Sequence, residues 1–228
     1  CSIKHSTLTG LDADDHTQYW IGDGSRASDY LQFNTSLTPT TSVEGRVHWD
    51  DDSGTMEVDL PGGNVKLQVG QEGLVRVRNE SGSDISNGLM VYTTGSSGNK
   101  PTVAHADNTD ADKIHLLGMA TEDIVHNANG YVALWGNVSG DMTQPINTLA
   151  YAEGTKLYLD TSGTWTDTHP PLPLNAVVII GEVMRQHASE GKIMLLPRYF
   201  TLGNNYNGTL RQSIINKSTG NAAGASFT

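Results

Sequence analysis

The chain has 228 residues, of which 36% are hydrophobic and only 7% aromatic, so we expect a thin hydrophobic core. Its formal net charge is −11, and an acidic surface repels phosphate backbones, which disfavours nucleic-acid binding. No apolar run approaches the roughly 18 residues that a membrane-spanning helix needs, and no basic and apolar leader opens the sequence. We therefore expect neither a nucleic-acid partner nor membrane insertion.

Residues that favour turns dominate the composition. Glycine alone accounts for 25 residues, well above the usual share of about 7%, and Ser, Thr, Asn and Asp are also frequent. Glycine supplies backbone with positive φ, and the short polar side chains hydrogen-bond their own backbone. The composition predicts an all-β chain of many short strands. The single cysteine, Cys1, allows no internal disulfide; we interpret it as a fragment boundary or a lipidated residue, and the chain as a piece of a longer polypeptide.

The first segment, residues 1–38, has too few apolar residues to form a core of its own. Its acidic run favours a turn or a single helical turn with a capping side chain. We expect this segment to pack against another surface, either the rest of the chain or further copies of itself. Five of its residues form our candidate oligomer interface: Leu8, Leu11, His16, Tyr19 and Trp20.

Residues 39–72 are predicted to form a small β-hairpin or meander. Two turn signals, DDDSG at 50–54 and PGGN at 61–64, separate apolar stretches. Residues 55–60 and 65–69 alternate between apolar and polar with period two, which is typical of half-buried strands. Because a lone hairpin is marginally stable in water, this region also needs a partner surface.

Residues 73–200 repeat internally. Four pairs of residues recur in one order, with offsets of 66, 66, 63 and 61: Gly88 and Gly154, Tyr92 and Tyr158, Gly118 and Gly181, Gly130 and Gly191. The shrinking offset places small deletions in loops, where they are tolerated. We expect the two copies to close into a small β-barrel or sandwich of about six to eight strands. Residues 201–228 are predicted to link to a further β-domain.

Several stretches resemble parts of bacteriophage fibres. Residues 8–19 read LTGLDADDHTQY, followed by DGSRA at 23–27, and this pattern resembles a connector between trimeric modules of phage tail fibres. Residues 74–198 resemble a module of phage fibres and are also similar to small β-barrel capsid decoration proteins. That second resemblance rests on VRVRN at 75–79, GMATEDI at 118–124, GYV at 130–132 and LYL at 157–159. Residues 216–224 resemble the start of repetitive fibre or tailspike domains.

The resemblance implies a non-enzymatic structural component of a phage virion fibre, in a tail fibre or tailspike, that forms an entwined homotrimer and supports host attachment. Its implied partners are other virion proteins of the tail, baseplate or capsid, and a host-surface glycan contacted through a distal region. The implied location is the virion, after synthesis in the bacterial cytoplasm. Two alternatives stay open: a capsid-associated head fibre or decoration protein, and a carbohydrate-binding or depolymerase module.

Candidate metal ligands are few. Asp14, Asp15 and His16 could hold a divalent cation if a threefold axis brought three copies together, but a capped turn is the preferred interpretation. The acidic run at 50–54 lacks the distal glutamate of a calcium-binding loop, so we expect a solvated turn there. We predict neither a metal nor a cofactor.

Catalytic patterns are equally few. Glu122 and Asp123 are adjacent in a segment predicted to be extended, so their side chains should point to opposite faces rather than form a glycosidase pair. No nucleophile motif occurs. We predict no catalytic residue. Four tryptophans could stack on sugars, although core and interface roles are the preferred interpretation: Trp20, Trp49, Trp135 and Trp165.

Overall fold

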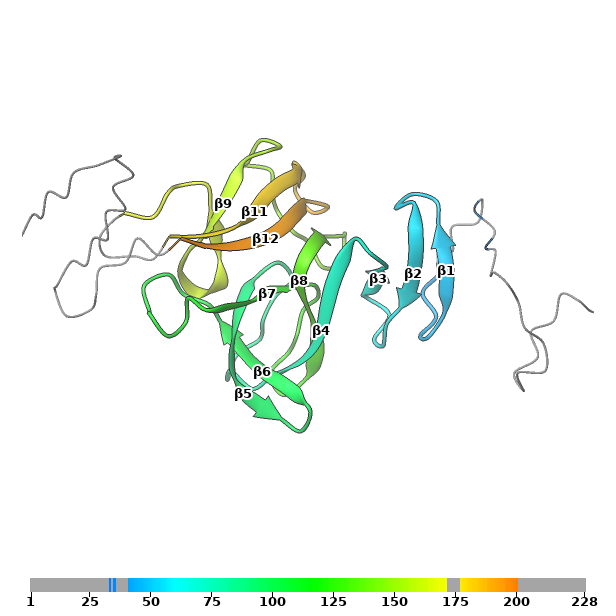
Figure 1. Cartoon of the computed structure of the whole chain (residues 1–228), viewed down its shortest axis with the longest axis horizontal. Coiled ribbons are helices and arrows are strands. Elements are labelled where there is room, and N and C mark those ends of the chain that lie inside the picture. Colours follow the sequence, from blue (N-terminus) through cyan, green and yellow to red (C-terminus); the bar gives the residue numbers. More distant parts are fainter. Residues whose placement is uncertain (1–32, 34, 36–40, 172–176, 201–228) are drawn as a thin grey trace, which may run out of the picture.

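The computed structural model describes residues 41–171 and 177–200, together with residues 33 and 35. This part of the chain is almost entirely β-structure, with twelve strands and one short 3-10 helix, η2 (Thr161–Gly163). The strands form a three-stranded sheet and a nine-stranded sheet (Figure 1). The expected all-β fold is confirmed. Among these residues, no helix has the length and apolar character to cross a membrane.

The three-stranded sheet is an antiparallel meander of β1 (Val47–Asp50), β2 (Thr55–Asp59) and β3 (Lys66–Gln68). Strands β2 and β3 lie where the alternating stretches 55–60 and 65–69 predicted them, and the acidic run forms the first turn. In that turn, the Asp50 carboxylate accepts a hydrogen bond of 2.8 Å from the backbone N–H of Ser53. Figure 1 shows this sheet at one end of the described chain, beside the start of β4 (Glu72–Asn79).

The nine-stranded sheet contains the remaining strands in the order β10-β9-β11-β12-β8-β4-β6-β5-β7. The bounds of those not yet given are β5 (Met90–Ser97), β6 (Lys100–His105), β7 (Leu116–Ala120), β8 (Asn129–Ser139), β9 (Lys156–Leu159), β10 (Trp165–Thr166), β11 (Val177–Arg185) and β12 (Lys192–Phe200). Because β7 also pairs with β8, the strands β8, β4, β6, β5 and β7 close into a barrel. The strands β12, β11, β9 and β10 continue from β8 as an open extension.

Strand pairing repeats along the chain with the offsets found in the sequence. Val91 pairs with Gly118 in the first copy, and Leu157 and Gly181, which lie 66 and 63 residues later, pair in the second. Met119 likewise pairs with Ala133, and Glu182 and Met194, which lie 63 and 61 residues later, pair with each other. A backbone hydrogen bond repeats in the same way: Gly88 N–H donates to Ala120 O at 2.9 Å, and Gly154 N–H donates to Val183 O at 2.7 Å. The two copies therefore fold alike around their central strand pairs.

The long strand β8 belongs to both copies. Its first half pairs with β4, for example Val132 with Val75, and its last residues pair with β12, for example Val138 with Ile193. The second copy nevertheless does not close into a barrel. The counterpart of the six-residue β6 is the two-residue β10, which pairs with β9 and ends the sheet. The closed barrel is thus smaller than the six to eight strands expected from the sequence.

The hydrophobic core consists of two clusters. The smaller cluster fills the closed barrel with Val77, Ile85, Val91, Val103, Ala120, Ile124 and Val132. The larger cluster draws on both copies and includes Met90, Met119, Ala133, Leu157, Leu159, Ile180, Val183, Ile193 and Leu195. Neither cluster includes a described residue of β1, β2 or β3, so the three-stranded sheet lies outside the hydrophobic core.

Gly118 and Gly181 occupy equivalent positions and both allow a close approach of strands. A Cβ on Gly118 would overlap the carbonyl oxygen of Ala133, and one on Gly181 would overlap that of Met194. We predict that Gly181→Ala lowers the free energy of unfolding by about 3 kcal/mol, because β11 and β12 must separate to admit the methyl group.

The control for this prediction is Gly154→Ala. Gly154 has a φ of +80° but no atom within 4 Å of an added Cβ, so its substitution introduces backbone strain without a clash. We expect a loss of about 1 kcal/mol there. Chemical denaturation of both variants measures the difference, and equal losses would contradict the close-approach role of Gly181.

Candidate functional site

The candidate oligomer interface named from the sequence lies outside the described residues and stays a prediction. It comprises Leu8, Leu11, His16, Tyr19 and Trp20. The possible cation ligands Asp14 and Asp15 lie outside them as well. The described part of the chain nevertheless contains a second candidate surface, in the three-stranded sheet.

One face of the three-stranded sheet is apolar and is not buried. Val47 pairs with Val58 and Val58 with Leu67, so these side chains share this face. The full set, which we call the apolar face, is Val47, Trp49, Met56, Val58, Leu67 and Val69. Val47 and Val69 are 45% and 38% exposed, and the other four are partly exposed. In a single chain this hydrophobic surface is only partly covered.

The opposite face of the same sheet is charged and buried. His48, Asp50, Glu57 and Asp59 are each no more than 8% exposed. Together with Lys66 and Gln68 on the same face, they form what we call the charged layer. The sequence alternation predicted two different faces, but it gave no indication that the charged one would be covered and the apolar one left open.

Ion pairs within the chain hold the charged layer in place. Arg46 Nη2 lies 2.8 Å from Asp59 Oδ2, and Lys66 Nζ lies 3.2 Å from Glu57 Oε2. His48 Nε2 lies 3.4 Å from the same Glu57 oxygen. Buried carboxylates without such partners would be strongly destabilising. The cations of Arg46 and Lys66 therefore allow this face of the sheet to be the buried one.

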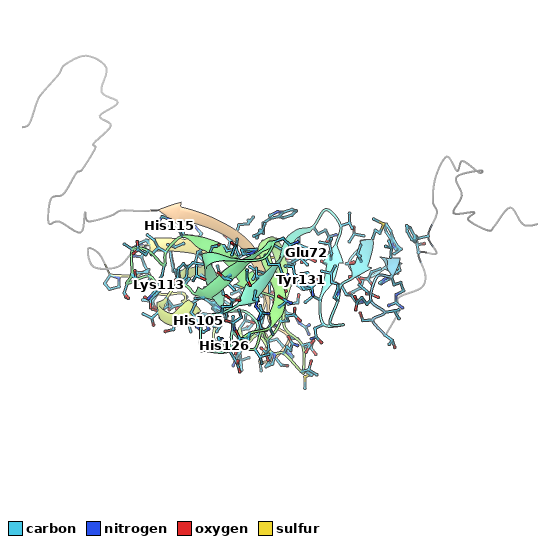
Figure 2. All side chains as sticks on the ribbon, turned by 90° about the horizontal axis from the view of Figure 1, so that it is seen from below. Glu72, His105, Lys113, His115, His126 and Tyr131 are labelled. Atoms are coloured by element: carbon cyan, nitrogen blue, oxygen red, sulfur yellow. The ribbon has the colours of Figure 1, made fainter. Side chains whose placement is uncertain are left out.

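Glu72 joins the charged layer to the barrel. It is the first residue of β4, and its Oε1 accepts a 2.8 Å hydrogen bond from the backbone N–H of Gln68. Burial, with a further contribution from the carboxylate of Glu57, raises the pKa of Glu72 to about 7. Figure 2 shows Glu72 at the junction between the barrel and the three-stranded sheet. This junction therefore changes its charge near neutral pH.

Glu122 and Asp123 lie in a turn after β7 rather than in the extended segment expected, and each has a separate structural partner. Glu122 accepts a 3.1 Å hydrogen bond from the backbone N–H of Tyr131 and a 3.4 Å bond from the amide of Asn64. Asp123 accepts a 2.8 Å bond from the backbone N–H of Asn87. Burial raises the pKa of Glu122 despite these bonds. The two carboxylates tie segments together and do not face each other.

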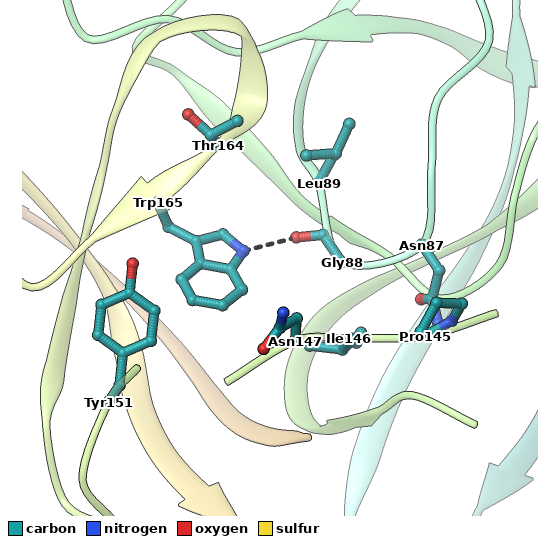
Figure 3. A pocket seen from close by; sticks show the side chains of 9 residues that line it. All are labelled: Asn87, Gly88, Leu89, Pro145, Ile146, Asn147, Tyr151, Thr164 and Trp165. Atoms are coloured by element: carbon teal, nitrogen blue, oxygen red, sulfur yellow. Dashed lines mark hydrogen bonds between the residues drawn. The ribbon is translucent and has the colours of Figure 1, made fainter. Parts of the chain in front are cut away.

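The described tryptophans lie in three different environments. Trp49 belongs to the apolar face. Trp135 is 44% exposed and lies against Gly73, where an added Cβ would meet its indole ring. Trp165 is partly buried and donates a 2.9 Å hydrogen bond from Nε1 to the carbonyl oxygen of Gly88 (Figure 3). Among the residues that the structure describes, no group of three His, Cys, Asp or Glu side chains could hold a metal ion.

The raised pKa of Glu72 gives a prediction about pH. Because folding raises this pKa from 4.5 to about 7, the folded state holds the proton more tightly than the unfolded state. The contribution of the Glu72 proton to the free energy of unfolding is therefore complete below pH 4.5 and is lost as the pH rises through about 7. Glu72→Gln keeps the acceptor oxygen and removes the titration, so at pH 8 it should unfold with a free energy about 1–2 kcal/mol higher than the parent chain, after allowance for solvent screening.

Urea unfolding between pH 4 and 8 measures this difference. The exposed Glu153 provides the control, because Glu153→Gln should change the stability by less than about 0.5 kcal/mol at either pH. Parallel stability curves for the parent chain and Glu72→Gln would contradict a coupled titration at the junction.

Comparisons with known proteins give a structural likeness but no match in sequence. No family model matches the sequence, and no curated protein matches it. Among solved structures, the chain is similar to the N base of the head fibre gp8.5 of bacteriophage phi29, with 14% sequence identity and a TM-score of 0.33. The match covers 55% of this chain and 94% of that one. At this TM-score the likeness carries no argument about function.

Proposed function

We propose that this chain is a non-enzymatic structural segment of a bacteriophage virion fibre, in a tail fibre or tailspike, and that it works as a homotrimer. The observation that carries the proposal is the apolar face, which stays partly exposed while the charged layer behind it is buried. A small sheet needs a covered hydrophobic face for stability. Association of copies supplies that cover, at about 25 cal/mol for each Å² of apolar area removed from water.

The position of the apolar face in the chain supports a fibre. In the sequence it comes after the segment at 8–27 that resembles a connector between trimeric modules. Two segments suited to self-association thus both fall within the first third of the sequence. An interface built from both would bring three chains together before the barrel begins. In this proposal the barrel and its extension form a module carried by the fibre, which contacts other virion proteins and supports attachment to the host.

The partners of five carboxylates support the non-enzymatic part of the proposal. Glu57 and Asp59 are engaged by cations, Glu72 by a backbone N–H, and Glu122 and Asp123 by separate donors. A hydrolase needs two carboxylates that face one substrate. These five carboxylates instead hold the chain's own segments together.

A charge on the apolar face should disrupt assembly. Val58 lies at its centre, between Val47 and Leu67. We predict that the parent chain has the mass of a trimer in light scattering, and that Val58→Asp shifts the mass to that of a monomer. A buried unpaired carboxylate at an interface is strongly unfavourable, so the shift should be complete at micromolar concentration.

Val125→Asp is the matched control for this experiment. Val125 is 55% exposed and lies in the turn between β7 and β8, away from the apolar face, so this variant should remain trimeric. A monomeric parent chain, or a trimer that survives Val58→Asp, would overturn the proposed use of the apolar face.

The N-terminal candidate interface gives a separate prediction. Replacing Tyr19 and Trp20 together by alanine should weaken oligomerisation and lower the thermal stability of the assembly, because aromatic side chains dominate the energetics of interfaces. Dilution series followed by light scattering, together with thermal melts, measure both effects. Unchanged assembly and unchanged melting would show that this segment is not an interface.

A further inference from the structure

The three-stranded sheet shares no hydrophobic core with the barrel. Among the described residues, none from the range 41–71, which contains this sheet, belongs to either hydrophobic cluster. The strand β3 pairs with β2 and with no strand of the barrel. Burial of apolar surface is the main favourable contribution to folding, so this unit lacks the interaction that usually fixes one part of a chain against another.

Two hydrogen bonds between described residues join this unit to the barrel. The backbone N–H of Gln68, in β3, donates to Oε1 of Glu72 at 2.8 Å. The amide Nδ2 of Asn64, in the turn before β3, donates to Oε2 of Glu122 at 3.4 Å. No ion pair between described residues crosses the same boundary. Both acceptors are carboxyl groups of the barrel, one at the start of β4 and one in the turn after β7.

The connection between the sheet and β4 is suited to bending. Gly70 lies in this connection with a φ of +83°, and an added Cβ there would meet no atom within 4 Å. The barrel side of the connection is tightly packed instead, because an added Cβ on Gly136 of β8 would overlap the backbone of Gln71 and Glu72. A glycine without close neighbours absorbs changes in backbone angle easily. Movement of the sheet would therefore be concentrated at Gly70.

The surroundings of Glu72 favour its neutral form. It is 8% exposed, and β8 presents only an uncharged residue, Gly136, to its backbone. Lys66 and His48 lie 3.2 and 3.4 Å from Glu57, and no ion pair between described residues reaches Glu72. Burial, with repulsion from the Glu57 carboxylate, raises the pKa of Glu72 to about 7.

Glu122 is also buried, with 7% of its surface exposed. Burial raises its pKa, and the neighbouring carboxylate of Asp123 adds to this effect. The donors of Asn64 and of the Tyr131 backbone, together with the charge of Arg76 on β4, act in the opposite direction without cancelling it. Both attachment points of the sheet are thus carboxyl groups that bind a proton more tightly than a hydrated carboxyl group does.

We propose that Glu72 and Glu122 form a proton-operated latch, which holds the three-stranded sheet against the barrel while both are protonated and releases it about Gly70 when they ionise. The docked position excludes water from both groups, and an ionised carboxylate without water or a cation is strongly unfavourable. Release hydrates both carboxylates and moves Glu72 away from Glu57. Because the docked state binds the Glu72 proton more tightly, this contribution to docking is complete below pH 4.5 and is lost as the pH rises through about 7.

The latch goes beyond the structural role proposed above. It allows one chain to change the orientation of its apolar face relative to its barrel in response to pH. Both hydrogen bonds lie within a single chain, so the latch does not depend on the trimer. Release and assembly are therefore separate properties that can be measured on the same sample.

The test measures the distance between the sheet and the barrel in the full chain as the pH changes. After Cys1→Ser, the exposed positions Asp52→Cys, between β1 and β2, and Asn99→Cys, between β5 and β6, carry a pair of fluorescent labels. Labelled chains are mixed with an excess of unlabelled chains, so that each assembly holds at most one labelled copy. Time-resolved energy transfer gives the distance distribution from pH 4 to pH 8.

We expect a single narrow distance distribution at pH 4 and a broad one at pH 8. The ratio of docked to released chains should fall at least about tenfold over this range, the effect of one unit of pKa. The double variant Glu72→Gln with Glu122→Gln keeps the acceptor oxygens and removes both titrations, so its distribution should stay narrow at pH 8. Glu153→Gln changes an exposed carboxyl group in the loop before β9 and should keep the parent pH profile.

A pair of variants at Asn64 tests the second attachment point without altering the barrel, because Asn64 is exposed. Asn64→Asp places a second carboxylate beside Glu122 and should move release to a lower pH by about one unit. Asn64→Ala removes the same donor without adding a charge and should shift the release by less.

The latch is overturned if the distance distribution is the same at pH 4 and pH 8, or if the double glutamine variant keeps the parent pH profile. Equal behaviour of Asn64→Asp and Asn64→Ala would remove Glu122 from the latch and overturn it as stated. Loss of strand signal in circular dichroism at pH 8 would show unfolding rather than release, with the same consequence. Light scattering reports the trimer independently, so a monomeric chain with a pH-dependent distance would reject the assembly proposal alone.

Discussion

The burial of charge in the three-stranded sheet determines which face of that sheet is exposed to solvent. Asp59 and Glu57 would be strongly destabilising inside the protein without a cation beside each of them, and Arg46 and Lys66 provide these cations. Once this face is fixed as the inner one, strand alternation turns every apolar residue of the sheet outward. The exposed apolar face thus follows from the ion pairs behind it, and the proposed trimer follows from the apolar face.

A second constraint is the sharing of β8 between the two copies. Because this strand ends the first copy and begins the second, the two units cannot separate as independent domains. The sharing also brings the segment before β5 next to β10, where Gly88 and Trp165 form their hydrogen bond. This contact joins residues 77 positions apart in the sequence.

Assembly is therefore assigned to one part of the chain, the three-stranded sheet. This sheet lies at one end of the described chain and offers a surface for copies of the same chain (Figure 1). Glu72 lies between this sheet and the barrel, and its raised pKa makes the connection sensitive to pH near neutrality.

The sequence by itself determined the features that depend on neighbours along the chain. Period-two alternation placed β2 and β3, the DDDSG run at 50–54 placed a turn, and the recurring glycines gave the offsets that relate the strand pairings of the two copies. These signals are local, since they arise from the side-chain period of a strand and from the backbone freedom of glycine.

Only the tertiary structure decided which face of each strand is covered, where the barrel closes and where the two copies touch. Each of these depends on contacts between distant segments: Arg46 with Asp59, β4 with β6, and Gly88 with Trp165. No local pattern records such contacts, because many arrangements satisfy the same alternation. The candidate interface at Leu8 to Trp20 rests on the sequence alone. The sequence thus predicted the parts, and the energetics of burying charge and closing sheets determined how they are joined.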